Sequence, residues 1–152
     1  AVVTSTIANG GTVLAPRVVH GFNTGGVTRP LPVTGSRRLD ASAAHFQTVR
    51  EGMLGAASAG GTAVTGRPDG VAIGGKTGTA EFGQPYPDGQ YDTHGWYTGF
   101  APYDDPEVVV IVYLEYGVGS THAGPVAKAI LEAYFALKDA SGGERVSAAA
   151  QP

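Results

Sequence analysis

The chain has 152 residues and a formal net charge of −3; 42% of its residues are hydrophobic and 15% are charged. This composition allows one ordinary hydrophobic core and predicts a single soluble globular domain. The arginines are scattered and form no basic patch, which argues against a nucleic-acid partner, and the absence of cysteine excludes disulfides and thiolate metal sites. No apolar run reaches the roughly 18 to 20 residues that span a bilayer.

The first nine residues predict the end of a helix. Asn9-Gly10-Gly11 supplies residues that tolerate the left-handed conformation used at helix C-caps, whereas no initiating Met and no N-cap precede Val2. We therefore expect the chain to be cut from a longer polypeptide inside a folded domain; a short, frayed terminal helix is the alternative. Thr12–Val19 is rich in β-branched residues and contains a proline, which predicts a short edge strand. Gly21–Arg38 predicts a loop or a ragged strand.

The middle of the chain predicts a helix, a strand and a long loop. Asp40 suits the N-cap position of a helix that runs to about Ala57. The face of this helix that we expect in the core holds Phe46, Val49, Met53 and Ala57. Gly70–Ala80 predicts a glycine-rich strand, and Phe82–Gly95 predicts a turn-rich loop. Because loops longer than about 12 residues are often functional rims or lids, this loop is a candidate wall of a binding cleft.

Two strands and a helix follow. Trp96–Ala101 and Glu107–Tyr116 predict an antiparallel hairpin. The nearly continuous apolar run Val108–Leu114 predicts a strand that is covered on both faces. A helix from Pro125 to about Leu137 is expected to lie against the sheet through an apolar stripe made of Val126, Ile130, Tyr134 and Leu137. The fold class is therefore α+β, a short antiparallel sheet with flanking helices in residues 1–140, and residues 141–152 predict a flexible tail or linker.

The informative segment for chemistry is Lys76-Thr77-Gly78-Thr79. On a strand it would place a cation, a hydroxyl donor and an open stretch of backbone along one edge, which suits an anionic acyl substrate. Glycine lacks a Cβ, so a ligand can approach the backbone closely, and the following N–H can point at a developing oxyanion. The triplet K-T-G is also a signature of penicillin-recognising serine acyl-transferases. An exposed lysine beside a turn glycine is the alternative interpretation of so short a match.

The order of the surrounding segments resembles the end of class B penicillin-binding proteins. The residues from Lys76 to Glu81 read KTGTAE, and a long loop, the segment Trp96–Pro102 and a final helix follow. Upstream, TIANGGTVLAPRVV, the helix segment REGM and Gly61-Thr62-Ala63 look like the same family in the same order. The resemblance covers about nine-tenths of the chain. Threonine and alanine after K-T-G look more like transpeptidases than like serine β-lactamases or D,D-carboxypeptidases.

Two motifs of that family are missing from this sequence. No serine is followed three residues later by lysine, so the family's nucleophile-and-base motif Ser-x-x-Lys is absent, and no serine begins its Ser-x-Asn motif. In the family both motifs precede K-T-G, so we expect this chain to be the C-terminal part of a transpeptidase domain with a partial penicillin-binding-protein/β-lactamase-like fold. The fragment alone is predicted to be inactive.

The resemblance implies a role for each K-T-G residue. Lys76 would supply positive charge beside the missing serine and the substrate carboxylate, and Thr77 would hydrogen-bond the carboxylate of a β-lactam or peptide. Gly78 would leave room, and Thr79 would donate its backbone N–H to the oxyanion hole. The implied ligands are peptidoglycan stem peptides ending in D-Ala-D-Ala and β-lactams, and no cofactor or metal is implied. The parent would be membrane-anchored through a segment missing here and would act outside the cytoplasm.

Three alternatives remain open from the sequence. The parent could be a D,D-carboxypeptidase or a serine β-lactamase, which transfers the acyl group to water, or a non-catalytic module that binds peptidoglycan. The histidines show no metal-ligand spacing and are expected to be solvated or hydrogen-bonded. Trp96 and Phe100 are expected in the core, Glu81 and Glu115 as ion-paired surface groups. The remaining ambiguous residues, Tyr86 and Tyr91, could contact substrate or stabilise their own loop.

Overall fold

The computed structural model describes residues 1–32 and 35–140. The helices are α1 (Val2–Ala8), α2 (Ala43–Ala56) and α3 (Gly124–Ala140), with a short 3₁₀ turn η1 (Val64–Gly66) and a π-helical turn η2 (Gly119–Ala123). The strands are β1 (Thr12–Val13), β2 (Gly21–Thr24), β3 (Val27–Pro30), β4 (Arg37–Arg38), β5 (Gly74–Phe82), β6 (Asp92–Ala101) and β7 (Val108–Leu114). The predicted tail, residues 141–152, lies outside the described residues.

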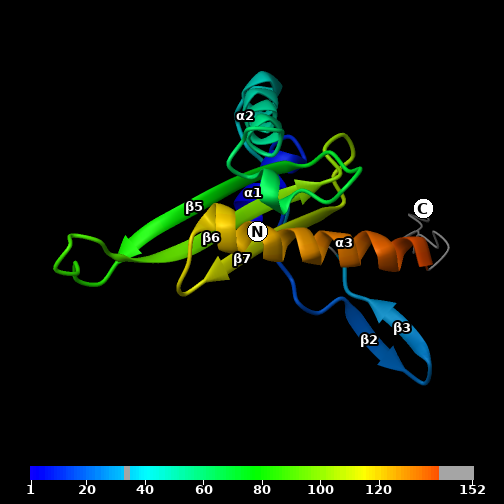
Figure 1. Ribbon diagram of the computed structural model, residues 1–152. Helices are drawn as coiled ribbons and strands as arrows, with labels where there is room; N and C mark the ends of the chain where they lie inside the picture. Colours follow the sequence, from blue (N-terminus) through cyan, green and yellow to red (C-terminus); the bar gives the residue numbers. More distant parts are fainter. Residues whose placement is uncertain (33–34, 141–152) are drawn as a thin grey trace.

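The main sheet is antiparallel with the strand order β5-β6-β7. Lys76 on β5 lies opposite Thr98 on β6, which in turn lies opposite Ile111 on β7. Figure 1 shows α3 running beside this sheet, α2 at its other side, and the end of the β5–β6 hairpin extending well beyond the helices. The α+β class and the predicted β6–β7 hairpin are confirmed, and β5 is an edge strand of its sheet.

The face of the sheet that meets α3 is buried and closely packed. Tyr97, Val110 and Val112 are buried there against Ala127 and Leu131 of the helix. The Tyr97 ring fits because two glycines leave it space: a Cβ on Gly66 or Gly75 would come within 2.2 or 2.4 Å of the Tyr97 side chain. Burial raises the pKa of Tyr97 to about 12. The glycine-rich start of β5 is therefore explained in part by core packing, independently of any ligand.

The opposite face is covered at one end by α1 and α2. Phe100 is fully buried there with Met53 and Ala8, and a Cβ on Gly74 would come within 2.4 Å of the Phe100 ring. Arg50 of α2 connects this helix to α1 and to the end of β6. Its guanidinium donates to the carbonyls of Ala8 and Tyr103 and lies 5.2 Å from the centre of the Phe100 ring. The half-buried cation is thus stabilised by carbonyl dipoles and an aromatic face.

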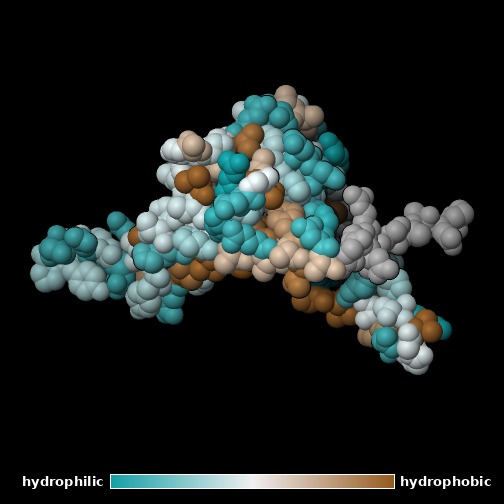
Figure 2. All heavy atoms as spheres, turned by 45° about the vertical axis from the view of Figure 1, so that its right-hand side comes forward, coloured by the Kyte–Doolittle hydropathy of each residue, from teal (hydrophilic) through white to brown (hydrophobic). Residues whose placement is uncertain are grey.

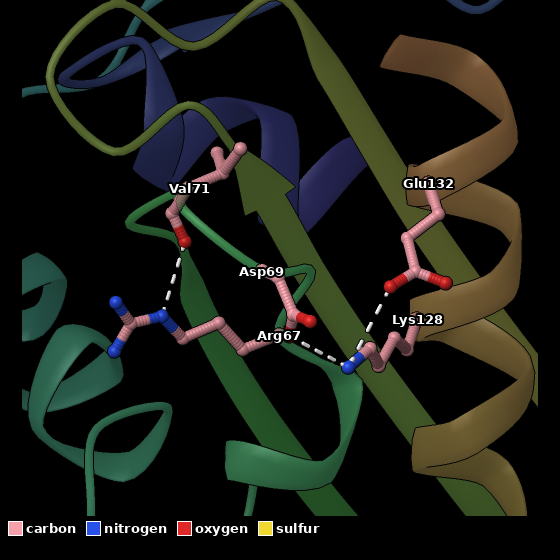
Figure 3. A network of polar contacts seen from close by, with 5 residues as sticks. All are labelled: Arg67, Asp69, Val71, Lys128 and Glu132. Atoms are coloured by element: carbon pink, nitrogen blue, oxygen red, sulfur yellow. Dashed lines mark hydrogen bonds and ion pairs between the residues drawn. The ribbon is translucent and has the colours of Figure 1, made fainter. Parts of the chain in front are cut away.

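The segment between η1 and β5 is attached to α3 by a polar network on the surface (Figure 3). Lys128 Nζ lies 2.8 Å from Asp69 Oδ1 and 3.5 Å from Glu132 Oε1, and Arg67 Nε donates to the carbonyl of Val71 at 3.1 Å. Lys128 lowers the pKa of Asp69, and Asp69 raises the pKa of Lys128, first through their hydrogen bond. Because Asp69 is exposed, this network contributes modestly to stability.

Several predicted strands differ from the structure. The predicted strand Thr12–Val19 is strand only over β1, which pairs with β4, because Pro16 removes a backbone donor soon afterwards. In the segment Gly21–Arg38, β2 and β3 form a regular hairpin, which we call the arm, that projects from the lower right of Figure 1. Its turn is Gly25-Gly26, both at positive φ. The predicted loop Phe82–Gly95 is shorter in the structure, because Phe82 belongs to β5 and residues 92–95 belong to β6, which leaves residues 83–91 as the connection.

The predicted apolar face of α2 is correct in part, and that of α3 is wrong. The N-cap of α2 is Ser42, not Asp40, and Val49 on the expected core face is 46% exposed, although Met53 and Ala57 are buried as expected. On α3, the expected stripe is on the outside, since Val126, Ile130 and Leu137 are all exposed. The helix instead buries small residues and one leucine, which lets it approach the sheet closely.

The prediction that β7 is covered on both faces is wrong for the described part of the chain. Val110 and Val112 are buried, whereas Ile111 and Tyr113 between them are 38% and 48% exposed. Figure 2 shows hydrophobic atoms gathered along the lower side of the molecule, between the β5–β6 hairpin and the arm. None of the helices that the structure describes has the length and apolar character needed to cross a membrane.

Candidate functional site

A groove lies beside the predicted K-T-G segment on the face of the sheet opposite α3. It encloses about 390 Å³. Its floor is formed by β5, β6 and β7, and α1 closes one end, where the Thr4 and Thr98 hydroxyls hydrogen-bond at 2.7 Å. We call it the K-T-G groove, and it is lined by Ala1, Val3, Thr4, Lys76, Thr77, Gly78, Trp96, Tyr97, Thr98 and Ile111.

Lys76 supplies the only cationic side chain among the lining residues. It is exposed, and its Nζ donates to the carbonyl of Thr77 at 2.6 Å, with no carboxylate among the lining residues to neutralise it. Gly78 follows on the same face, where a Cβ would come within 3.2 Å of Trp96 Cβ. The groove therefore offers a positive charge beside unobstructed backbone and an aromatic surface, which suits an anionic ligand with an apolar part.

The hydroxyl of Thr77 is held from outside the sheet. Its Oγ1 donates to Oγ1 of Thr62 at 3.1 Å, and Thr62 lies in the segment between α2 and η1. Thr77 lies opposite Tyr97 in the β5–β6 register and is half-buried. The side chain thus has a defined neighbour while it remains accessible.

Thr79 has a different environment from the other three. It is not among the residues that line the groove, and its Oγ1 accepts a hydrogen bond from the backbone N–H of Gly119 at 3.1 Å. Gly119 itself packs over the sheet so closely that a Cβ there would lie 2.4 Å from the Gly78 carbonyl oxygen and 2.6 Å from that of Trp96. The turn before α3 is therefore attached directly to the K-T-G strand.

Lys76, Thr77 and Gly78 line the groove in the structure, and Thr79 follows them on the same edge strand. The prediction that Trp96 is a core residue is wrong, because it is 42% exposed and lines the groove. Thr62 and Gly119 were not predicted as site residues. The only sequence signal for Thr62 is its place in Gly61-Thr62-Ala63, and Gly119 has none beyond being glycine.

The other polar residues considered from the sequence do not line the K-T-G groove. His94 lies stacked on Phe82, with ring centroids 3.9 Å apart, and His122 Nδ1 accepts the Val118 N–H at 2.9 Å. Tyr86 Oη donates to an Asp92 carboxylate oxygen at 3.0 Å, a contact within its own hairpin that raises the pKa of Tyr86. Glu81 and Glu115 are exposed, and neither takes part in the ion pairs found in residues 1–32 and 35–140. Within those same ranges, no three histidine or acidic residues cluster so as to hold a metal ion.

Comparison with known proteins identifies the family. The model of the penicillin-binding protein transpeptidase domain matches residues 1–132. This chain belongs to that family. The peptidoglycan D,D-transpeptidase PbpA of Mycobacterium tuberculosis is 33% identical in an alignment of 139 residues that covers 86% of this chain and 27% of the relative. Penicillin-binding protein 2B of Streptococcus pneumoniae is 31% identical in an alignment of 143 residues that covers 86% of this chain and 21% of the relative.

Solved structures agree with the sequence comparison. Penicillin-binding protein A from M. tuberculosis, as its imipenem acyl-enzyme complex, superposes with a TM-score of 0.72 at 32% identity, over 88% of this chain and 29% of that one. The D,D-transpeptidase domain from Eggerthella lenta gives a TM-score of 0.68 at 31% identity, over 88% and 31%. The chain thus spans less than a third of the length of these relatives, and the K-T-G strand lies within the part that matches.

Proposed function

We propose that this chain is the C-terminal part, residues 1–140, of a peptidoglycan D,D-transpeptidase, and that the K-T-G groove is its contribution to the active site. The observation that carries the proposal is the placement of Lys76, Thr77 and Gly78 on an open edge strand beside that groove. The relatives named as peptidoglycan D,D-transpeptidases favour this activity over hydrolysis by a carboxypeptidase or β-lactamase.

The proposed reaction uses a serine that lies in a part of the enzyme this chain does not contain. The serine oxygen attacks the carbonyl of the D-Ala-D-Ala peptide bond of a stem peptide, its proton passes to a base, and the terminal D-alanine leaves as an amine. An amine of a second stem peptide then attacks the acyl-serine ester, which forms the cross-link and restores the serine. β-Lactams would acylate the same serine; imipenem and penicillin G form acyl-enzyme complexes with the M. tuberculosis relative.

The groove residues take the roles that the resemblance implies. Lys76 attracts the substrate carboxylate, Thr77 hydrogen-bonds it, and Gly78 leaves the approach open. The backbone N–H of Thr79 is our candidate oxyanion donor. Its direction is supported by Lys76 Nζ, which bonds the Thr77 carbonyl. If that carbonyl faces the open edge, the N–H of Thr79 faces it too, because alternate residues of a strand direct their backbone groups to the same side.

The proposed activity implies where the parent enzyme would act. Peptidoglycan stem peptides are assembled into the wall outside the cytoplasm, so the parent would act there, held by a membrane anchor that is not part of this chain. No cofactor is required by the proposed chemistry.

The direct test is acylation of the full-length protein by a fluorescent penicillin. We expect Lys76→Ala to lower the rate on the order of 10- to 100-fold, the worth of a lost charge-assisted contact, with little change in melting temperature because Lys76 is exposed. Lys128→Ala, on the far side of the sheet, is the matched control. Unchanged acylation of Lys76→Ala together with a large drop in melting temperature would reverse the assignment.

A second test uses the 152-residue chain alone. Because it has no serine followed three residues later by lysine, we expect no covalent adduct after incubation with excess penicillin, measured by intact-mass spectrometry. A stoichiometric adduct mapped to any of its serines would show that the nucleophile has been misplaced.

A further inference from the structure

Thr62 occupies a position that the fold fixes tightly. It follows the end of α2, where a Cβ on Gly61 would lie 2.2 Å from the carbonyl oxygen of Ala56, so only glycine fits the bend. On its other side, the Ala63 N–H donates to that same Ala56 carbonyl at 2.8 Å, and the Ala63 carbonyl accepts from Tyr97 Oη at 3.0 Å. The backbone around Thr62 is therefore anchored both to α2 and to the core of the sheet.

From this anchored segment, Thr62 reaches the K-T-G strand. Its hydroxyl accepts the proton of the Thr77 hydroxyl at 3.1 Å, a contact between residues 15 positions apart in the chain. Lys76 does not compete for Thr77 Oγ1, since its ammonium bonds the Thr77 carbonyl. Thr62 is thus the side chain that sets which way the Thr77 hydroxyl points.

A hydroxyl group has one proton to donate and two lone pairs that accept. Thr77 and Tyr97 share the α3 face of the sheet, so a carboxylate would meet the Thr77 hydroxyl at the open edge of β5, beside the groove. If Thr77 gives its proton to a carboxylate at this edge, it can keep its bond to Thr62 only when Thr62 rotates its own proton toward Thr77. The pair then forms a chain from Thr62 through Thr77 to the anion, and hydrogen bonds in such chains strengthen one another. A valine at either position would break the chain, and a serine would preserve it.

We propose that Thr62 is a positioning residue for Thr77: it accepts the Thr77 proton in the absence of a ligand and donates to Thr77 when a carboxylate-bearing ligand binds. The proposal rests on the function proposed above and adds to it a residue outside the K-T-G strand. Thr62 contacts Thr77 and does not line the groove itself, so its whole effect is expected to pass through Thr77.

A double-mutant cycle on the full-length protein tests that dependence, with benzylpenicillin acylation as the readout. We expect Thr62→Val to slow acylation at low penicillin concentration on the order of threefold to tenfold, the worth of one hydrogen bond, and Thr62→Ser to keep the wild-type rate. In a Thr77→Val background, Thr62→Val should cause no further loss. Thr48→Val is the matched control, because Thr48 is an exposed threonine of α2 whose hydroxyl bonds the Ala44 carbonyl.

The proposal is overturned if Thr62→Val behaves like Thr48→Val, if Thr62→Ser is as slow as Thr62→Val, or if the loss persists in the Thr77→Val background. Three-bond couplings from the backbone nitrogen and carbonyl carbon of Thr77 to its γ-carbon, measured on the 152-residue chain, provide a readout without activity. One Thr77 rotamer is expected in the wild type and Thr62→Ser, and averaged rotamers in Thr62→Val; a single rotamer in all three overturns the proposal. Failure of the wild-type protein to acylate contradicts the proposed function instead, and the couplings then still decide whether Thr62 positions Thr77.

Discussion

Replacing Tyr97 with phenylalanine removes one hydrogen bond and one buried phenol that can ionise. Measuring the stability of both proteins at two pH values separates these two contributions. Tyr97 is 1% exposed, and its hydroxyl donates to the Ala63 carbonyl at 3.0 Å. The N–H of Gly66 donates to the same carbonyl at 3.1 Å, so removing the hydroxyl leaves that oxygen with a partner. We therefore expect Tyr97→Phe to lower the free energy of unfolding at pH 7 by about 1 kcal/mol, the worth of one hydrogen bond.

At high pH the comparison changes, because only the wild type has this phenol. Its pKa is 10.0 when solvated and about 12 in the fold. A raised pKa means that stability is fully present below pH 10 and is lost as pH rises through the folded value. Between pH 7 and pH 11, ionisation of Tyr97 in the unfolded wild type lowers its free energy of unfolding by about 1.4 kcal/mol. The variant should then be the more stable by a few tenths of a kcal/mol.

The assay is urea unfolding followed by far-ultraviolet circular dichroism at both pH values. All other titrating groups are common to the two proteins, so their contributions cancel in the difference. A stability gap that is the same at pH 11 as at pH 7 would refute the reasoning, because it would mean that Tyr97 ionises as easily in the fold as in water.

Three further substitutions test a close backbone contact, the hydrogen bonds of a half-buried cation and a surface ion pair. Gly119→Ala is expected to cost about 1–3 kcal/mol in urea unfolding, because its Cβ would meet the Gly78 carbonyl, whereas Gly52→Ala in open space on α2 should be neutral or stabilising. Arg50→Lys should cost about 1–2 kcal/mol, since one ammonium cannot replace a planar fork that bonds two carbonyls; an unchanged melting temperature would contradict this. The pKa of Asp69 is lowered, so the wild type should be more stable to unfolding than Asp69→Asn above pH 3.8, and this difference should disappear as pH falls further. A difference in stability that persists in acid would contradict the ion pair.

The α3 helix shows why its existence was predictable but its orientation was not. The sequence contains two apolar stripes, one of large residues through Val126 and Ile130 and another through Ala127 and Leu131. Sequence reasoning chose the larger side chains. The fold buries the second stripe, because alanine lets the helix approach the β-sheet and Gly124 packs against Thr65. Such a choice depends on the partner surface, which no local pattern contains.

The candidate site likewise contains residues that could be predicted from the sequence and residues that could not. Lys76 to Thr79 could be located from the sequence, since the motif is contiguous and glycine-rich on one strand. The roles of Thr62 and Gly119 depend on contacts across 15 and 40 positions. Trp96 was assigned to the core as part of an aromatic strand expected to pack on both faces, and its exposure follows from its register opposite Gly78, on the face that α3 does not cover.

The arm formed by β2 and β3 has a consequence for how unfolding of this chain would be observed. Its strands pair with each other, and Leu31 N–H closes its base on the His20 carbonyl at 2.8 Å. All four residues of β3 are exposed, so little apolar surface couples the arm to the sheet. Segments of this kind open locally at lower free energy than the core. The single tryptophan, Trp96, lies in the sheet, so its fluorescence would report a cooperative transition of the core and remain silent while amide hydrogens of the arm exchange independently.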